Sequence, residues 1–82
     1  MTTKTVNVRI PNDDDRNAAL LVQTASSFDA RIHITFLNKT VNAKSIMGVM
    51  TLPLEDGNSI TIQAEGNDEE KAVNALVRFF QG

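Results

Sequence analysis

The order of its hydrophobic periods is the feature that most constrains what this chain can fold into. Segments 5–10, 31–37 and 59–64 alternate apolar and polar residues, which is typical of strands that bury one face. A tight turn at Asn38-Lys39 joins the second segment to a short arm, 40–44, as in a hairpin. The sequence therefore predicts four strands, two of which form a hairpin.

Helical segments separate these strands. After Arg16, apolar residues recur at i, i+3, i+4 and i+7, and Phe28 closes the face that they form. Ser45 is a suitable N-cap for a short helix that ends at Met50. A final helix opens near Asn67, whose spacing from Glu70 matches a capping box. The predicted order is βαββαβα.

This order defines the fold class. Because each strand shows one apolar and one polar face, we expect a four-stranded antiparallel sheet with three helices on one face. This is an open-faced two-layer α+β sandwich. The 82 residues fit one domain that spans 1–82.

Composition excludes several classes of function. The net charge of −2 argues against direct binding of nucleic acid, which needs clustered Lys and Arg. No apolar run approaches the ~20 residues of a membrane span, and the N-terminus does not resemble a secretory signal. Cysteine is absent, which excludes disulfides and thiolate metal sites and fits a cytoplasmic protein. We expect no metal and no cofactor.

Two segments carry a resemblance to a known family. Residues 20–26 (LLVQTAS) and 41–50 (VNAKSIMGVM) are similar, nearly letter for letter, to the HPr phosphocarrier family. Gly66 and Asp68-Glu69 also align, and the resemblance covers essentially the whole chain without gaps. It implies the HPr-like open-faced sandwich, in agreement with the predicted element order.

The resemblance breaks at the site where HPr proteins carry phosphate. The family places a phosphoryl group on a histidine within G-x-H-A-R-P, just before the first helix. Counting back from 20–26 puts Asp14 at the histidine position, and only the arginine remains, as Arg16. A carboxylate cannot replace a neutral imidazole in this reversible transfer, and adjacent aspartates repel a phosphoryl donor. His33 lies mid-strand on the polar face, so it cannot replace the lost histidine. We therefore predict no catalytic residue and no enzyme.

The acidic run, Asp13 to Asp15, has several interpretations. The plainest is a solvated helix cap, since carboxylates favour the positive end of a helix. A weak site for a divalent cation and an aspartyl phosphate on Asp14 are two others.

Ser45 is the strongest candidate site. A helix N-cap alone would explain a serine here. The resemblance implies in addition that a dedicated HPr kinase/phosphorylase phosphorylates it, and a phosphate at this position gains from the helix dipole.

Candidate partner-binding residues surround Ser45. Ile46, Met47 and Met50 lie on the short helix, where they are either core or an apolar docking patch. Leu20 falls off the apolar stripe of the first helix, so it is expected to join that patch. Arg16 either balances the neighbouring aspartates or contacts a partner, as the equivalent arginine does in the family.

The resemblance is nearest to the histidine-lacking Crh-type (catabolite repression HPr-like) members. It implies a regulator in carbon catabolite repression and the sugar phosphotransferase system, which binds a catabolite control protein A type transcription factor. Crh-type proteins keep most of the loop around the lost histidine, and this chain does not. The alternatives are a phosphoryl carrier fed from phosphoenolpyruvate and an unmodified interaction module. The segment after Pro11 also suggests a hinge for strand exchange, and hence a homodimer.

Overall fold

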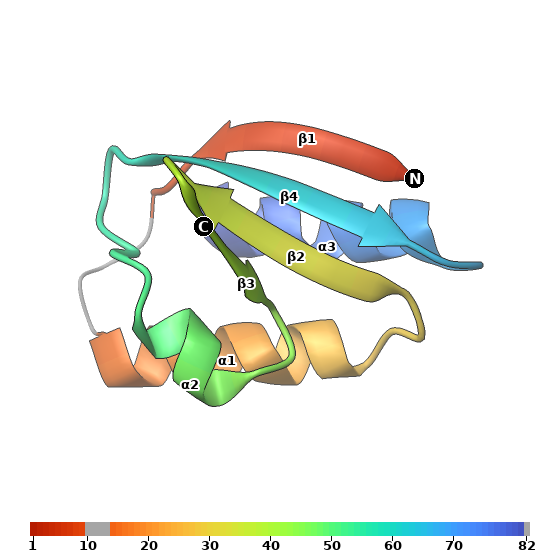
Figure 1. The fold of residues 1–82 in the computed structure, drawn as a ribbon, viewed down its shortest axis with the longest axis horizontal. Helices are drawn as coiled ribbons and strands as arrows, with labels where there is room; N and C mark the ends of the chain where they lie inside the picture. The colour runs from red at the N-terminus through yellow and green to blue at the C-terminus, as the bar shows by residue number, and fades with distance from the viewer. Residues whose placement is uncertain (10–13, 82) are drawn as a thin grey trace.

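The computed structural model describes residues 1–9 and 14–81 (Figure 1). Within them the element order is the predicted one. The elements are β1 (Thr2–Asn7), α1 (Asp14–Ser26), β2 (Arg31–Phe36), β3 (Lys39–Asn42), α2 (Ile46–Met50), β4 (Ser59–Glu65) and α3 (Glu69–Gln81).

The four strands form one sheet in the order β1-β4-β2-β3, and every neighbouring pair is antiparallel. Figure 1 shows the sheet as one layer, with α1 and α2 beneath it and α3 behind β4 and β2, so that the helices share one face of the sheet. The α+β two-layer sandwich with helices on one face is therefore confirmed. Since β1 and β3 are the edge strands, the described part of the chain bonds β1 to the rest of the sheet through β4.

The core lies between the sheet and the helices. Alternate strand residues point into it, so that burial along β4 follows the period of two that its sequence predicts. The largest fully buried side chains are Phe80, Leu21, Ile32, Ile34, Ile60, Ile62 and Leu76. Phe79 packs edge-on against Phe80, with 5.2 Å between the ring centroids. The helices are thus held to the sheet by aliphatic side chains, and by Phe80 at the end of α3.

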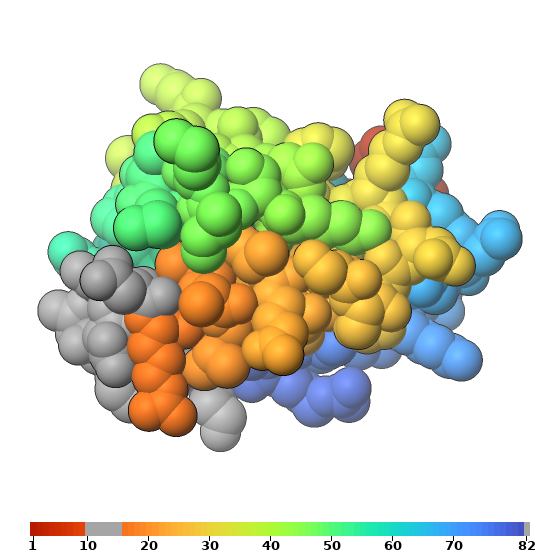
Figure 2. All heavy atoms as spheres, turned by 90° about the horizontal axis from the view of Figure 1, so that it is seen from below, coloured from red at the N-terminus to blue at the C-terminus, as the bar shows by residue number. Residues whose placement is uncertain are grey.

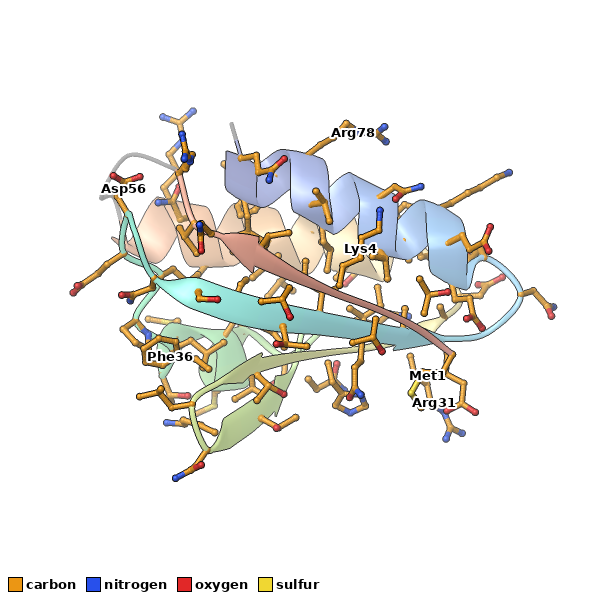
Figure 3. The ribbon with its side chains drawn as sticks, turned by 90° about the horizontal axis from the view of Figure 1, so that it is seen from above. Met1, Lys4, Arg31, Phe36, Asp56 and Arg78 are labelled. Atoms are coloured by element: carbon orange, nitrogen blue, oxygen red, sulfur yellow. The ribbon has the colours of Figure 1, made fainter. Side chains whose placement is uncertain are left out.

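The outer face of the sheet is polar (Figure 3). Thr5, Thr61, Thr35 and Thr40 form one row across all four strands in the observed register. Hydroxyl pairs at 3.1 Å (Thr5–Thr61) and 2.8 Å (Thr35–Thr40) join the strands within this row. His33 lies half-buried on the same face, as predicted.

Both boundaries of β1 differ from the prediction. β1 starts three residues before Thr5, because Thr2 already pairs with Ala64 of β4. It ends at Asn7, although Val8 is still fully buried and donates its N–H to Asn58 O. The predicted end of the strand at Pro11 lies outside the described residues.

The hairpin turn is one residue earlier than predicted. Leu37 has a φ of 54°, which ends β2 at Phe36 and leaves Leu37 and Asn38 as the turn residues. Lys39 therefore belongs to β3, where it pairs with Phe36. β3 ends at Asn42, two residues before the end of the predicted arm.

Both long helices begin differently from the prediction. α1 starts at Asp14 rather than after Arg16, since aspartates are favourable in the first turn of a helix. The capping box of α3 joins Gly66 and Glu69, not Asn67 and Glu70. Glu69 Oε1 accepts the Gly66 N–H at 3.2 Å, and Glu69 N–H donates to Gly66 O at the same distance.

Glu69 also ties β1 to α3, and this makes it a source of acid sensitivity. Its Oε2 accepts the Thr2 hydroxyl at 2.6 Å and lies 2.9 Å from the Met1 ammonium. The pKa of Glu69 is lowered from 4.5 to about 2. The hydrogen bond from Thr2 is the largest cause, and it is followed by the hydrogen bonds from the Met1 ammonium and from the Gly66 N–H.

We expect Glu69→Gln to flatten the acid side of the stability profile. Because the pKa is depressed on folding, the contribution of Glu69 is present above about pH 4.5 and is lost as the pH falls towards 2. The free energy of unfolding of the wild type should fall more steeply than that of the variant across this window. Urea unfolding at several pH values measures both slopes. Glu70→Gln, at an exposed carboxylate in the same turn, is the matched control, and identical slopes for all three proteins would contradict the prediction.

Candidate functional site

Ser45 is the N-cap of α2, as predicted. Its backbone is extended (φ −105°, ψ 112°), its Oγ accepts the Gly48 N–H at 3.3 Å, and its carbonyl accepts the Val49 N–H at 2.9 Å. The side chain is half-buried. The hydroxyl therefore lies at the first turn of the helix, on a residue that is only partly buried.

The segment just before Ser45 is held at three points. The Lys44 N–H donates to Asn42 Oδ1 at 2.8 Å, and the Ser45 N–H donates to Asn42 O at 3.0 Å. The Lys44 ammonium reaches Phe28 O at 2.6 Å, just beyond the end of α1. This last bond holds the chain segment that precedes Ser45 against the connection between α1 and β2. It was not predicted, because nothing local in the sequence relates Lys44 to Phe28.

The short helix α2 has one buried side and one exposed side. Val49 is fully buried and anchors it to the core. Ile46 is 40% exposed, Met47 79% and Met50 57%, so these three side chains cover the other side with apolar surface. The core interpretation is therefore wrong for all three, because the helix turns only Val49 inward.

Leu20 adds to this surface from α1. It is 40% exposed, whereas its neighbour Leu21 is fully buried, which separates the two residues as the sequence predicted. Figure 2 shows α1 and α2 side by side on the helical side of the molecule. We call the set Leu20, Ile46, Met47 and Met50 the α1–α2 surface.

A small hollow lies between these two helices. It has a volume of about 100 Å³. The residues that line it are Ala18, Val49, Met50, Leu52, Pro53, Leu54 and Glu55. Its walls are largely aliphatic, and Met50 belongs both to the hollow and to the α1–α2 surface.

The predicted residues at the start of α1 are only partly described. Arg16 is exposed in the first turn. Asn12 and Asp13 lie outside the described residues, and of Asp14 and Asp15 only the helical backbone is described. The interpretation of Asp14 as the residue at the phosphohistidine position stays a prediction.

Asp68 also holds the connection between α1 and β2. Its carboxylate accepts the Asp29 N–H at 2.9 Å and the Ala30 N–H at 2.8 Å. The Asp29 N–H is the main cause that lowers the pKa of Asp68. The sequence predicts Asp68 as a carboxylate at the start of the last helix and as part of the aligned turn, but it gives no signal for these long-range bonds to Asp29 and Ala30.

Among residues 1–9 and 14–81, no three or more His, Cys, Asp or Glu side chains gather in a way that could hold a metal ion. None of the helices in this part is both long and apolar enough to cross a membrane.

A family model for the PTS HPr component phosphorylation site matches residues 2–82. The chain therefore belongs to the HPr family of the phosphotransferase system, and the resemblance seen in its sequence is confirmed. This family comprises small α+β proteins of the fold described above.

Individual relatives include both branches of the family. The chain is 45% identical over 82 residues to the HPr-like protein Crh of Halalkalibacterium halodurans, which covers 99% of this chain and 98% of that protein. The crystal structure of phosphocarrier protein HPr from Bacillus anthracis superposes with a TM-score of 0.92 at 48% identity, covering 98% and 96% of the two chains. Bacillus subtilis Crh, crystallised as an intertwined domain-swapped dimer, superposes with a TM-score of 0.77 at 37% identity, covering 93% and 84%.

Proposed function

We propose that this chain is an HPr-like regulator of carbon catabolite repression that is phosphorylated on Ser45 by an HPr kinase/phosphorylase. The phosphoprotein binds a catabolite control protein A type transcription factor through the α1–α2 surface. It acts in the cytoplasm as a binding protein and not as an enzyme. The observation that carries this proposal is that Ser45 caps a helix whose apolar side is exposed.

Several features support this role. Ser45 is only partly buried, and a kinase needs access to it. Met47 and Met50 offer flexible apolar side chains, which adapt well to a partner surface. The exposed Arg16, in the first turn of α1, provides a cation that would bind a phosphate or an acidic group of the partner. Similarity to a Crh protein points in the same direction.

A phosphoryl carrier is the second candidate. It is favoured by the similarity to phosphocarrier protein HPr and by the retained Arg16. The residue at the carrier position, Asp14, argues against it. Incubation with phosphoenolpyruvate and enzyme I distinguishes the two roles, and we expect no acid-labile phosphoryl group on this chain.

A homodimer formed by strand exchange is compatible with the fold. β1 is an edge strand whose only sheet partner among the described residues is β4, and the related Crh exchanges a segment between two copies. Exchange of β1 would keep its register with β4 of the second copy. Sedimentation at several concentrations tests for this dimer.

We expect Met47→Asp to weaken docking of the phosphoprotein by about 10- to 100-fold. Burial of one such apolar side chain contributes about 1.5–3 kcal/mol, and a buried aspartate adds a desolvation cost. Titration calorimetry with the transcription factor measures the dissociation constant. Leu37→Asp is the matched control, because Leu37 is 80% exposed but lies on the β2–β3 turn, outside the α1–α2 surface.

Ser45→Ala separates phosphorylation from docking in the same assay. If regulation depends on the phosphate, Ser45→Ala and Met47→Asp should both lose the interaction. Loss from Met47→Asp alone would instead favour an unmodified interaction module. Equal binding by both variants and the wild type would contradict docking through this surface.

A further inference from the structure

The residue types that react readily with mild oxidants are few in this chain. It has no cysteine, tryptophan or tyrosine, and it has three methionines. Two of these, Met47 and Met50, stand one helical turn apart on α2, with 79% and 57% of their surface exposed. A two-electron oxidant that reaches the folded protein therefore meets mainly thioether sulfur.

The third methionine is remote from α2. Met1 precedes β1 and lies beside Arg31 near the far end of the sheet (Figure 3). Its sulfur lies 3.8 Å from Gln63 Nε2, on β4. The oxidisable sulfur of the α1–α2 surface thus belongs to Met47 and Met50, within five residues of Ser45.

We propose that Met47 and Met50 form a reversible oxidation site that controls docking through the α1–α2 surface. The oxidant is hydrogen peroxide. The thioether sulfur attacks one peroxide oxygen, the O–O bond breaks, and the second oxygen leaves as water. Sulfur is oxidised by two electrons and the peroxide is reduced by two. Methionine sulfoxide reductases reverse the step: two thiols become a disulfide and the sulfoxide oxygen leaves as water.

The structure separates this chemistry from the fold. Val49, which anchors α2, is fully buried, whereas both sulfur-bearing side chains lie on the exposed side of the helix. The Ser45 cap is made by Gly48 N–H and does not involve either methionine. A sulfoxide therefore makes the docking surface polar while the core and the cap remain as they are. Such a polar group is unfavourable only when a partner buries it.

The test uses protein that is phosphorylated on Ser45 first and then treated with hydrogen peroxide, so that kinase recognition is not measured. The inference rests on the proposed function, and the probe is the catabolite control protein A type regulator. We expect mass spectrometry to find about 32 Da added to the peptide with Met47 and Met50. Circular dichroism should be unchanged, docking should weaken about tenfold or more, and sulfoxide reductases should restore it.

Met47→Leu/Met50→Leu is the matched variant, since it keeps an apolar surface without sulfur. Its docking should not respond to peroxide, although Met1 is still present to be oxidised. Unchanged docking after full oxidation, resistance of both side chains to peroxide, or unfolding on oxidation would each overturn the inference. If the reduced phosphoprotein itself fails to dock, the proposed function is contradicted, and this inference with it.

Discussion

Incubation with ATP and an HPr kinase is expected to place one phosphoryl group on Ser45, and Ser45→Ala is expected to take up none. Ser45 is the serine that caps α2, and among the described residues its Oγ accepts a hydrogen bond from the Gly48 N–H, at the long distance of 3.3 Å. That contact is weak enough for the hydroxyl to turn towards a kinase. Intact-mass and peptide mass spectrometry measure the uptake and its position.

Ser45→Asn is the matched control for the structural role of this residue. Asparagine caps helices about as well as serine, whereas Ser45→Ala should cost about 0.5–2 kcal/mol of stability. Both variants lack the hydroxyl, so both should remain unphosphorylated, and only the alanine variant should be less stable. Phosphate on another serine, or none on the wild type, would remove the basis of the proposed regulation.

Much of the fold follows from local sequence patterns. The strands were found because one face of the sheet is buried and the other carries Thr, Gln and His side chains, which imposes a period of two. Ser45 and α2 were found because an N-cap is a local signal. The helical period alone predicts that Leu20 lies off the buried stripe to which Leu21 belongs. The structure agrees, because Leu20 is 40% exposed and Leu21 is fully buried.

The remaining features depend on residues that are far apart in the sequence. Asp68 binds the Ala30 N–H across 38 positions, and Lys44 binds Phe28 O across 16. Neither contact leaves a periodic pattern. The shift of the capping box also involves a distant residue, because Gly66 packs closely against Ala30. The hairpin turn was misplaced because Leu37, a residue that rarely adopts positive φ, does so here.

The contact between Gly66 and Ala30 is where these distant interactions meet. Gly66 has a φ of +152°, and a Cβ on it would lie 2.8 Å from Ala30 Cα and 3.1 Å from Ala30 Cβ. This close approach brings Asp68 within reach of the Asp29 and Ala30 N–H groups. The same connection receives the Lys44 ammonium at Phe28 O, next to Ser45. Gly66 therefore supports the site through the connection between α1 and β2.

We expect Gly66→Ala to be among the most destabilising single substitutions in the chain. An unfavourable φ costs about 1–3 kcal/mol, and a forced contact in a packed region costs about 1–3 kcal/mol more. The free energy of unfolding of a domain of this size is only about 4–12 kcal/mol in total. Urea unfolding measures the loss through a lower midpoint at an unchanged m-value.

Gly57→Ala is the matched control that isolates the contact from the backbone conformation. Gly57 also has a positive φ, +94°, but a Cβ there would meet nothing within 4 Å. Gly57→Ala should therefore show only the conformational cost, and Gly66→Ala should exceed it by about the cost of the clash. Equal losses in the two variants would mean that Ala30 moves aside freely. In that case the Asp68 and Lys44 bonds would not depend on this contact, and the structural link from Gly66 to Ser45 would fail.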